Sequence, residues 1–576
     1  MLNKKTKSGL VLLCIFFNGI ISAQDSTSSR KFKVSGSISV QYEHYGLSRN
    51  PTGWSGFLPR KPWNQVRFNW TPEFQFPKWK LPVNFNFATT PVNFVGPYSG
   101  IQKQSFSQYI TNPMNNFALN PTFKWGEIQL GTQYLNYSEL STGDVGIFGA
   151  GVDLKPATYR VKFFAGLSNQ AVNFFNIPGL DGAYRRFNWM FQLGKEKEGK
   201  YSFALNFVKG KDDINSVDSV SPNIKPQEGI TMSVVSKVNF AKEWYFSAEG
   251  AQSIFTQDLS LPLDSSKPSM KPFIKGHSTT RKDFAAGAAI GRKGKRFDIG
   301  LKSKFIGAGF RTMGYPFMLP DRLDLTLNTR IMAWKNKDGI DRMNITASAG
   351  QRINNLSNNT IRAKQFIGNL NWFTQFDDHW SLNISYNNFG FQTPSGFNPY
   401  GIKNVSNDLG INPTYTFSTE KIMHFLSLSY NWSKYDERDV TNGNTSTNNT
   451  HSVILSWTPT FLQKKLTPDF SVLYFLNELP GFRFTIFTFS SGLTLPEINK
   501  KISLRAQAQY QLSKNNNFTK NNNLIGSLNS DWRLTQKLIW NVYLSSNHFK
   551  YGNESAPPEA SYLETNIRTG FQYRFN

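Results

Sequence analysis

The sequence predicts an all-β fold: a single large antiparallel transmembrane β-barrel of about 26 strands, within a range of about 24–28. Three observations support this prediction. Apolar and polar residues alternate with period two along most of the 576 residues. Short turns alternate with longer polar connections, and the N-terminus has the layout of an export signal.

Residues 1–23 are expected to be a signal peptide. Three lysines precede the apolar stretch 9–21 (GLVLLCIFFNGII), and Ser22-Ala23 offers a small-residue cleavage site. The apolar stretch is shorter than the ~20 residues that a membrane-spanning helix needs, which argues against the alternative of a retained anchor. The single cysteine, Cys14, follows Leu13 inside this stretch, so a lipoprotein signal is not expected. The mature chain therefore has no thiol for a disulfide or a metal site.

Composition limits the class of partner. Aromatic residues make up 15% of the chain, yet mean hydropathy is −0.42, which is typical of ordered strands with one apolar face. Sixty-four basic and 38 acidic residues give a net charge of +26. Such a charge favours anionic partners or permeants. Nucleic acid is not expected, because the exported chain has no recognisable nucleic-acid-binding module.

The strands follow one another from residue 31 to the C-terminus, after a short periplasmic segment 24–30. Where the pattern is clear they have about 10–13 residues, enough for a tilted membrane strand. Segments 146–155 and 409–420 are weaker. Clear alternation is seen near the start, in the middle and late in the chain, for example over residues 31–42, 201–207, 380–386 and 502–512.

The connections fall into two alternating classes. Short turns such as Ala241-Lys242 and Asp377-Asp378 are expected on the periplasmic side, and longer connections on the extracellular side. We count about 13 outer and about 12 inner connections, which is consistent with an even strand number and two periplasmic termini. The expected long connections include 46–63, 89–115, 211–227, 256–281, 392–408 and 434–450, the last containing a low-complexity surface loop at 441–450 (TNGNTSTNNT).

Two soluble architectures are alternatives. Hairpins recur about every 42 residues, close to the repeat of a propeller blade. A blade needs four short strands in that length, however, and this chain supplies two long ones. A β-solenoid or sandwich array is the other alternative.

The final strand resembles the C-terminal β-signal of bacterial outer-membrane proteins. Phe571, Tyr573 and Phe575 alternate with polar residues, although Asn576 follows the last aromatic residue. Together with Gln24 as the first mature residue and the many Asn and Phe residues, this is similar to barrels of the Bacteroidota type. The resemblance implies an outer-membrane location, contact with outer-membrane lipid, and recognition by the outer-membrane insertion machinery during biogenesis.

No specific functional family is matched. Only about seven residues separate Gln24 from the first strand, far too few for a domain of the usual size. We therefore expect neither the plug of TonB-dependent transporters nor the periplasmic domains of insertase or lipopolysaccharide-transport barrels. A peptidoglycan-binding domain is not expected either, so residues 31–576 are expected to be barrel alone.

Basic residues recur on the face of the strands opposite the aromatic one. That face is expected to line the lumen, where a positive bias would favour anions. A simpler interpretation is that a face in contact with water tolerates charged residues of either sign. The candidate lumen-facing residues are Lys162, Lys302, Lys304, Arg330, Arg505 and Arg568.

No pattern indicates catalysis, a metal site or a cofactor. Histidines are scattered, and no serine stands out as a nucleophile, so an enzyme is not expected. Asp377-Asp378 and Asp436-Glu437 could supply ligands to a divalent cation, but neither pair lies in an extended ligand loop. Gly146–Gly151 does not precede a helix, so it is not expected to bind phosphate.

Two functions remain. An open barrel of about 26 strands would leak, because barrels of 16–18 strands already leave an aqueous channel. Either inward-folded loops narrow the lumen, with 89–115 and 256–281 as candidates, or a protein partner fills or caps it. The first hypothesis is a porin-like passive conduit for anionic or bulky solutes. The alternative is a scaffold subunit of a secretion, assembly or polymer-export complex.

Overall fold

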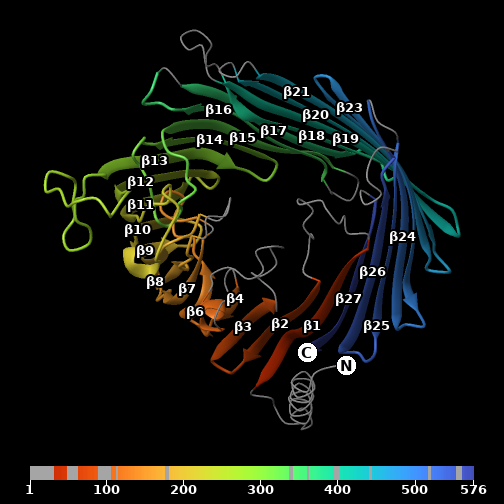
Figure 1. Cartoon of the computed structure of the whole chain (residues 1–576), viewed down its shortest axis with the longest axis horizontal. Helices are drawn as coiled ribbons and strands as arrows, with labels where there is room; N and C mark the ends of the chain where they lie inside the picture. The colour runs from red at the N-terminus through yellow and green to blue at the C-terminus, as the bar shows by residue number, and fades with distance from the viewer. Residues whose placement is uncertain are drawn as a thin grey trace.

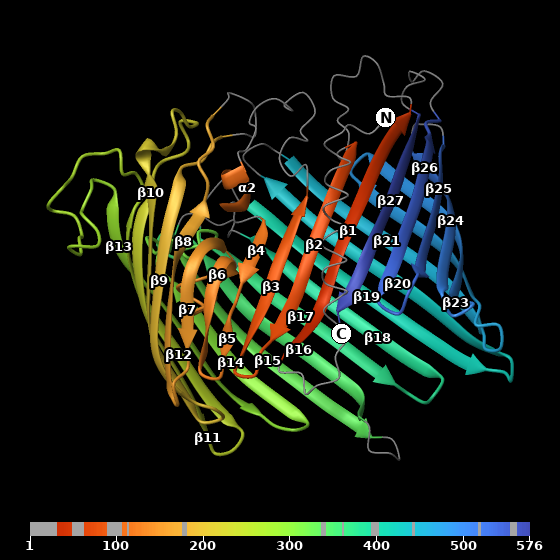
Figure 2. The same cartoon turned by 90° about the horizontal axis from the view of Figure 1, so that it is seen from below.

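The computed structural model describes residues 32–48, 63–88, 106–111, 115–143, 145–174, 181–335, 341–359, 362–392, 402–439, 444–516, 520–552 and 561–575. The predicted signal peptide and the segment 24–30 lie outside the described residues. In the described part, almost every residue in regular structure belongs to one antiparallel sheet that curves into a ring (Figure 1). Its strands are tilted relative to the barrel axis (Figure 2).

The strands follow the order of the sequence around the ring. Each pairs with its neighbours in the chain, as hairpins require. The described elements are β1 (Lys33–Ser48), β2 (Asn64–Gln75), β3 (Trp79–Ala88), α2 (Phe106–Thr111), β4 (Asn116–Leu119), β5 (Thr122–Phe123), β6 (Gly126–Tyr134), β7 (Gly146–Leu154), β8 (Tyr159–Asn169), β9 (Arg185–Lys197), β10 (Tyr201–Asp213), η2 (Ile214–Ser216), β11 (Glu228–Phe240), β12 (Trp244–Thr256), β13 (Thr280–Lys293), β14 (Phe297–Ile306), β15 (Arg322–Lys335), β16 (Asp341–Asn354), β17 (Ala363–Gln375), β18 (Trp380–Gln392), β19 (Ile402–Ser418), β20 (Ile422–Asp439), β21 (Asn444–Phe461), β22 (Thr467–Leu479), β23 (Phe482–Ile498), β24 (Ile502–Asn515), β25 (Asn521–Arg533), β26 (Leu538–Lys550) and β27 (Tyr562–Phe575).

The first and last strands close the barrel. β1 pairs antiparallel with β27 from Gly36 opposite Phe575 to Ser48 opposite Leu563. The two short strands β4 and β5 share one position between β3 and β6, so the 27 described strand segments form a closed barrel of 26 strands. Closure pairs the strands at both ends of the sheet, leaving no free edge. The predicted fold class and strand number are confirmed, and the propeller and solenoid alternatives are wrong.

Between the described strands lie 12 inner connections of two to five residues and 13 outer ones of two to 27 residues. The inner turns include consecutive residues in the left-handed region, such as Ala241 (φ 46°) and Lys242 (φ 62°). Two such residues match the twist of tight β-hairpins. The asymmetry places the inner turns on the periplasmic side and the outer connections on the extracellular side.

Of two expected loops, one is mainly strand and the other is strand over its second part. β20 and β21 remain paired up to Asp439 opposite Asn444, so most of 434–450, including the end of 441–450, continues the hairpin. β19 begins at Ile402, inside the expected loop 392–408. Both faces of a strand are wet once it leaves the membrane, so the polar residues there no longer alternate with apolar ones. Backbone pairing continues without that pattern.

The two faces of the barrel wall differ sharply in chemistry. On β10, Phe203 (46% exposed) and Leu205 (45%) point outward, whereas Asn206 (1%) points inward. Aromatic rings form ladders across the outer face, as in Trp532, Trp540 and Phe571, with centroids 5.8 and 6.1 Å apart. An apolar exterior on a closed antiparallel barrel is the structure by which strands cross a bilayer. The chain is therefore an outer-membrane β-barrel.

The described residues include no helix with the length and apolar character needed to cross a membrane.

Candidate functional site in the barrel lumen

The strand registers place the six candidate basic residues on the inner face. Lys302 and Lys304 alternate with the outward-facing Leu301, which is 46% exposed. Arg330 lies opposite Asp298, and Arg568 lies opposite Tyr543 on the neighbouring strand. Lys162 and Arg505 likewise alternate with outward residues of β8 and β24.

Four of these six residues form ion pairs. Lys162 Nζ lies 3.7 Å from a carboxylate oxygen of Asp153. Arg330 Nε lies 2.7 Å from Asp298. Lys302 and Lys304 share Glu139, at 2.9 and 3.0 Å. Acidic partners therefore neutralise much of the positive charge that the sequence places on this face, and the same holds for Arg67–Glu43, Arg186–Asp212 and Arg352–Asp324.

Arg505 and Arg568 are different. In the part of the chain that the structure describes, no salt bridge joins either residue to a carboxylate. The Arg568 guanidinium lies over the Tyr543 ring, 4.9 Å from its centroid, and Arg505 is exposed on the inner face. The two arginines belong to one row across the wall, because Arg505 pairs with Asn529, Asn529 with Tyr543, and Tyr543 with Arg568.

Among the described connections, two fold into the lumen: residues 135–143 and 145, between β6 and β7, and residues 307–321, between β14 and β15. Leu135 and Tyr137 of the first pack against inward-facing side chains of β7–β10, namely Ile147, Phe164, Met190 and Val208. Leu140 packs with Phe310 and Met318 of the second connection and with inward residues of β12–β14. Phe164 and Phe310 are fully buried. We call these two connections the lumen loops.

Hydrogen bonds join the lumen loops to each other. Gly143 N donates to the carbonyl oxygen of Gly314 (2.9 Å). Thr312 Oγ1 donates to the carbonyl oxygen of Ser141 (2.8 Å). Backbone pairing of Thr142 with Gly314 adds a short parallel bridge. The two loops therefore form one unit rather than two separate flaps.

Polar side chains of the wall hold this unit. Asn188 Nδ2 donates to the carbonyl oxygen of Met313 (3.1 Å), and Gln192 Nε2 donates to that of Tyr137 (3.2 Å). Ser138 Oγ lies 3.1 Å from Ser233 Oγ. These wall residues are buried, so each bond satisfies a polar group that has lost contact with water.

Small residues in the wall make room for the loops. A Cβ atom at Gly210 would lie 2.6 Å from Met313 Cβ and 2.5 Å from Asn188 Oδ1. A Cβ atom at Gly229 would lie 3.1 Å from Met313 Cγ. The absence of side chains at these two positions lets Met313 approach the backbone of β10 and β11.

Glu139 anchors the first lumen loop electrostatically. It lies in the connection, outside the spanning strands, and bonds both Lys302 and Lys304. Burial acts to raise the pKa of its carboxyl. The hydrogen bonds and charges of the two lysines outweigh that effect, so the pKa of Glu139 is lowered. The carboxylate form is thus the one that the folded loop favours.

The connection 256–281, expected to narrow the lumen, lies outside the wall (Figures 1 and 2). Phe273 stacks on Trp189 with centroids 6.0 Å apart, and Trp189 shares the outer face with Phe187, which is 50% exposed. Ile274 is buried against Ile230 and Ile254. The prediction for this connection is wrong, because its apolar residues cover the apolar outer face of β9–β12 instead of entering the wet interior.

Most of the other expected constriction, 89–115, lies outside the described residues. Its described helix α2 contacts the upper end of β3, where Tyr109 donates to the carbonyl oxygen of Ala88 (2.8 Å). The Tyr109 ring meets that of Phe117 edge-on at 6.3 Å. Phe117 lies opposite Phe85 on the outer face, so this part of the connection also contacts the outer side.

The lumen loops were not identified from the sequence. Residues 307–321 (GAGFRTMGYPFMLPD) are unusually apolar for an outer connection. The inward face of β7 and β8 also carries three glycines, Gly149, Gly151 and Gly166, above the polar pair Asp153 and Lys162. Together, these two signals could have indicated a connection packed against the inner wall.

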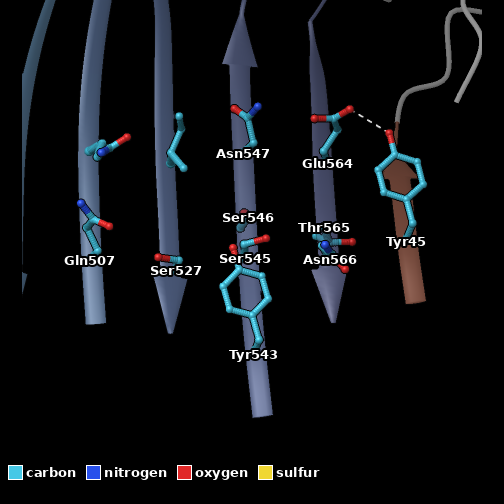
Figure 3. Close-up of a pocket in the computed structure, with 12 residues that line it drawn as sticks. Tyr45, Gln507, Ser527, Tyr543, Ser545, Ser546, Asn547, Glu564, Thr565 and Asn566 are labelled. Carbon is cyan, nitrogen blue, oxygen red and sulfur yellow. Dashed lines mark hydrogen bonds between the residues drawn. The ribbon is translucent and has the colours of Figure 1, made fainter. Parts of the chain in front are cut away.

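A polar recess lies on the wall formed by β24–β27 and β1 (Figure 3). Its volume is about 410 Å³. Side chains of five neighbouring strands line it, and the dashed line in Figure 3 marks the 2.7 Å hydrogen bond that Tyr45 donates to Glu564. Its polar lining includes Tyr45, Gln507, Gln509, Ser527, Ser545, Asn547, Glu564 and Asn566.

Three of the four carboxylates considered for metal binding, Asp377, Asp378 and Asp436, have other partners. Asp377 accepts backbone hydrogen bonds from Trp380 (2.6 Å) and His379 (2.8 Å), which lower the pKa of its carboxyl. Asp378 pairs with Arg342 at 2.8 Å. Asp436 accepts a bond from Thr447 (3.2 Å). Across the described ranges, no group of three or more His, Cys, Asp or Glu residues is placed to hold a metal ion.

Comparison with known proteins gave structural similarity alone. No family model matches the chain, and no curated protein matches it. A mutant ferric enterobactin receptor (PfeA) of Pseudomonas aeruginosa is 9% identical, with a TM-score of 0.42 over 94% of this chain and 80% of that one. The translocation pore of the P pilus usher PapC is 10% identical, with a TM-score of 0.42 over 95% and 100%. OccAB4 of Acinetobacter baumannii is 11% identical, with a TM-score of 0.30 over 67% and 98%.

Proposed function

We propose that this outer-membrane barrel is a passive, porin-like conduit for hydrophilic solutes, narrowed on one side by the lumen loops. The observation that carries the proposal is a closed 26-strand wall whose inner face is polar. Barrels of 16–18 strands already leave an aqueous channel. The lumen loops pack against the wall between β7 and β14, which is a different part of the wall from the polar recess of β24–β27 and β1.

The proposal gives the lumen a preference for anions that depends on Arg505 and Arg568. Paired cations contribute little to selectivity, because each has a carboxylate within about 4 Å that offsets its field. Of the six candidate residues, Arg505 and Arg568 have no such salt bridge among the described residues, and they lie in one row on the lumen wall. Glu43, which pairs with Arg67, is the next residue of this row beyond Arg568. The two arginines are the groups that would enrich an anionic solute. The proposal involves no catalytic step, cofactor or metal.

Planar-bilayer recording of the purified full chain tests the conduit. We expect stable single-channel conductance and a reversal potential in a salt gradient that indicates anion preference. Bilayers that stay silent although the inserted protein is folded would contradict the proposal.

A scaffold role in a surface complex is the second candidate. Phe317 (80% exposed) and Leu319 (62% exposed) protrude from the second lumen loop, and exposed apolar residues at a barrel mouth are typical of contact with another protein. The test is extraction from the native outer membrane in mild detergent, followed by size analysis and protein identification. A partner at fixed stoichiometry supports this role, whereas a solitary monomer counts against it.

A further inference from the structure

The polar recess on β24–β27 and β1 has the chemistry of a saccharide-binding site. Two successive rows of inward-facing residues form it. The lower row runs from Gln507 through Ser527, Ser545 and Asn566 to Tyr45. The upper row runs from Gln509 through Ile525 and Asn547 to Glu564. Figure 3 shows the labelled members of both rows side by side on adjacent strands.

The backbone of the recess offers nothing to a ligand. Every strand here pairs on both sides, so its N–H and C=O groups bond neighbouring strands. A ligand must therefore be recognised by side chains. A peptide, which is usually bound by adding a strand to an open sheet edge, has no edge to join.

The side chains present suit hydroxyl groups. A serine hydroxyl and a glutamine or asparagine amide each offer both a donor and an acceptor. A sugar hydroxyl also donates and accepts, so it can satisfy such a group in both directions. Asn547 Oδ1 and Asn566 Oδ1 are buried acceptors with no hydrogen-bond partner among the described residues. Buried acceptors of this kind require a donor. Both atoms have almost no accessible surface, so a ligand hydroxyl reaches them only after the amide groups turn toward the recess.

The charged and aromatic groups near the recess further limit the class of ligand. The one carboxylate in the lining, Glu564, already accepts the Tyr45 hydroxyl, so a cation finds no cluster of free acids. Arg568 lies one row below the recess, over the Tyr543 ring. Tyr45 and Tyr543 both contribute to the lining, but Tyr45 is 4% exposed and stacks on Trp63, and Arg568 covers one face of the Tyr543 ring. Recognition therefore depends mainly on the polar side chains of the recess.

We propose that this recess binds a neutral oligosaccharide that enters or passes through the lumen. A volume of about 410 Å³ lies within the usual range for small-ligand sites of about 300–1,000 Å³, which suits two to three sugar rings of a longer chain. The inference rests on the proposed conduit only in requiring that solutes reach the lumen.

Equilibrium binding to the full chain, purified in a detergent without a sugar headgroup, tests the inference. The probes are maltohexaose, laminarihexaose and mannohexaose, with the anionic tetragalacturonate as a charge control, and calorimetry as the measurement. We expect at least one neutral hexasaccharide to bind and tetragalacturonate to bind more weakly. If no neutral hexasaccharide binds, or if only tetragalacturonate binds, the inference is overturned.

A matched pair of variants locates the site. Ser527→Leu with Ser545→Leu removes two facing hydroxyls and fills the recess, and we expect the dissociation constant to rise at least about tenfold. Ser348→Leu with Asn369→Leu makes the same kind of change at facing inward positions of β16 and β17 and is expected to leave binding unchanged. Equal effects of the two pairs would overturn the assignment. Heat-modifiable migration in electrophoresis confirms that each variant is folded.

Conductance measured on the same preparations separates the two proposals. Saccharide binding without ion conductance would contradict the conduit and leave the recess standing. Conductance without saccharide binding would contradict the recess and leave the conduit standing.

Discussion

Two arginines and one glutamate illustrate how pairing determines the role of a charged residue in this lumen. Arg505 and Arg568 have no salt bridge in the described part of the chain, whereas Glu139 bonds Lys302 and Lys304 at once. A charge with a close partner of opposite sign has a short-range field, whereas an unpaired one acts on passing ions. We therefore expect ion selectivity to depend on the two arginines and anchoring of the first lumen loop to depend on Glu139.

Charge reversal at Arg505 and Arg568 is expected to change ion selectivity. In Arg505→Glu with Arg568→Glu, four units of charge are altered on one side of the lumen, so the preference should move from anions toward cations. The measurement is the reversal potential in a salt gradient. The double variant with lysine at both positions keeps the charge and should behave like the natural protein. An unchanged reversal potential in the glutamate variant would show that these arginines do not select ions.

The loop anchor at Glu139 is expected to weaken in acid. Its folded pKa lies below the ordinary value of 4.5, so its contribution to holding the loop is present above that value and is lost as pH falls through the lowered pKa. Hydrogen exchange of residues 135–143 should therefore be slow at pH 7 and faster below pH 4.5, after correction for the intrinsic pH dependence.

Glu139→Gln provides the comparison for the acid effect. It removes the titrating group, so exchange of the loop should be faster at neutral pH and no longer change through the acid range. A loop that loosens equally in both proteins would mean that another group controls it.

At the scale of elements, the position of the lumen loops depends on side-chain packing against the wall. The backbone pairing of the hairpins does not determine that position. Met313 lies against Gly210 and Gly229 and is 2% exposed. Truncating a buried methionine costs about 2–5 kcal/mol, and an unpaired buried carboxylate is also strongly unfavourable. A single substitution is therefore enough to detach the second loop from the wall.

Met313→Asp is expected to release the loop and raise single-channel conductance or its noise. The matched control is Leu263→Asp, the same kind of change in the β12–β13 connection outside the wall, where the leucine is 62% exposed. The control should conduct like the natural protein. If both variants conduct normally, the lumen loops do not narrow the path.

The aromatic residues of the last strand lead to a prediction about insertion of the barrel into the membrane. Phe571 is 50% exposed on the outer face, and the rings of Tyr573 and Phe575 meet edge-on at 5.3 Å. If these aromatics form the recognition signal for insertion, Tyr573→Ala with Phe575→Ala should lower the yield of folded barrel in the outer membrane. Ile567→Ala, an outer-face change on the same strand, should have little effect. The heat-modifiable fraction measures the yield, and equal yields would contradict a signal role.

For the whole molecule, the amount of backbone pairing differs from one part of the barrel wall to another. The 13 residue pairs between β1 and β27 leave no weak seam at that junction. The wall between β3 and β6 is different, because β4 and β5 together supply only six pairs to β3 and four to β6. Gly131, with φ of 87°, marks the irregularity there. We expect hydrogen exchange within the wall to be fastest in β4 and β5 and slow at β1–β27.

The sequence by itself determined the barrel class, the strand number and which side chains face lipid. Each of these depends on period-two alternation and on short turns, which are local properties of the chain. Alternation failed where the two faces of a strand have similar surroundings, as in the wet hairpin of β20 and β21.

Only the tertiary structure decided which connections enter the lumen, which cations are neutralised and where the polar recess forms. Glu139 and Lys302 are 163 positions apart, and Tyr45 and Glu564 are 519 apart. Contacts over such separations follow from ring closure and loop packing. They exist only after the wall has brought distant strands together.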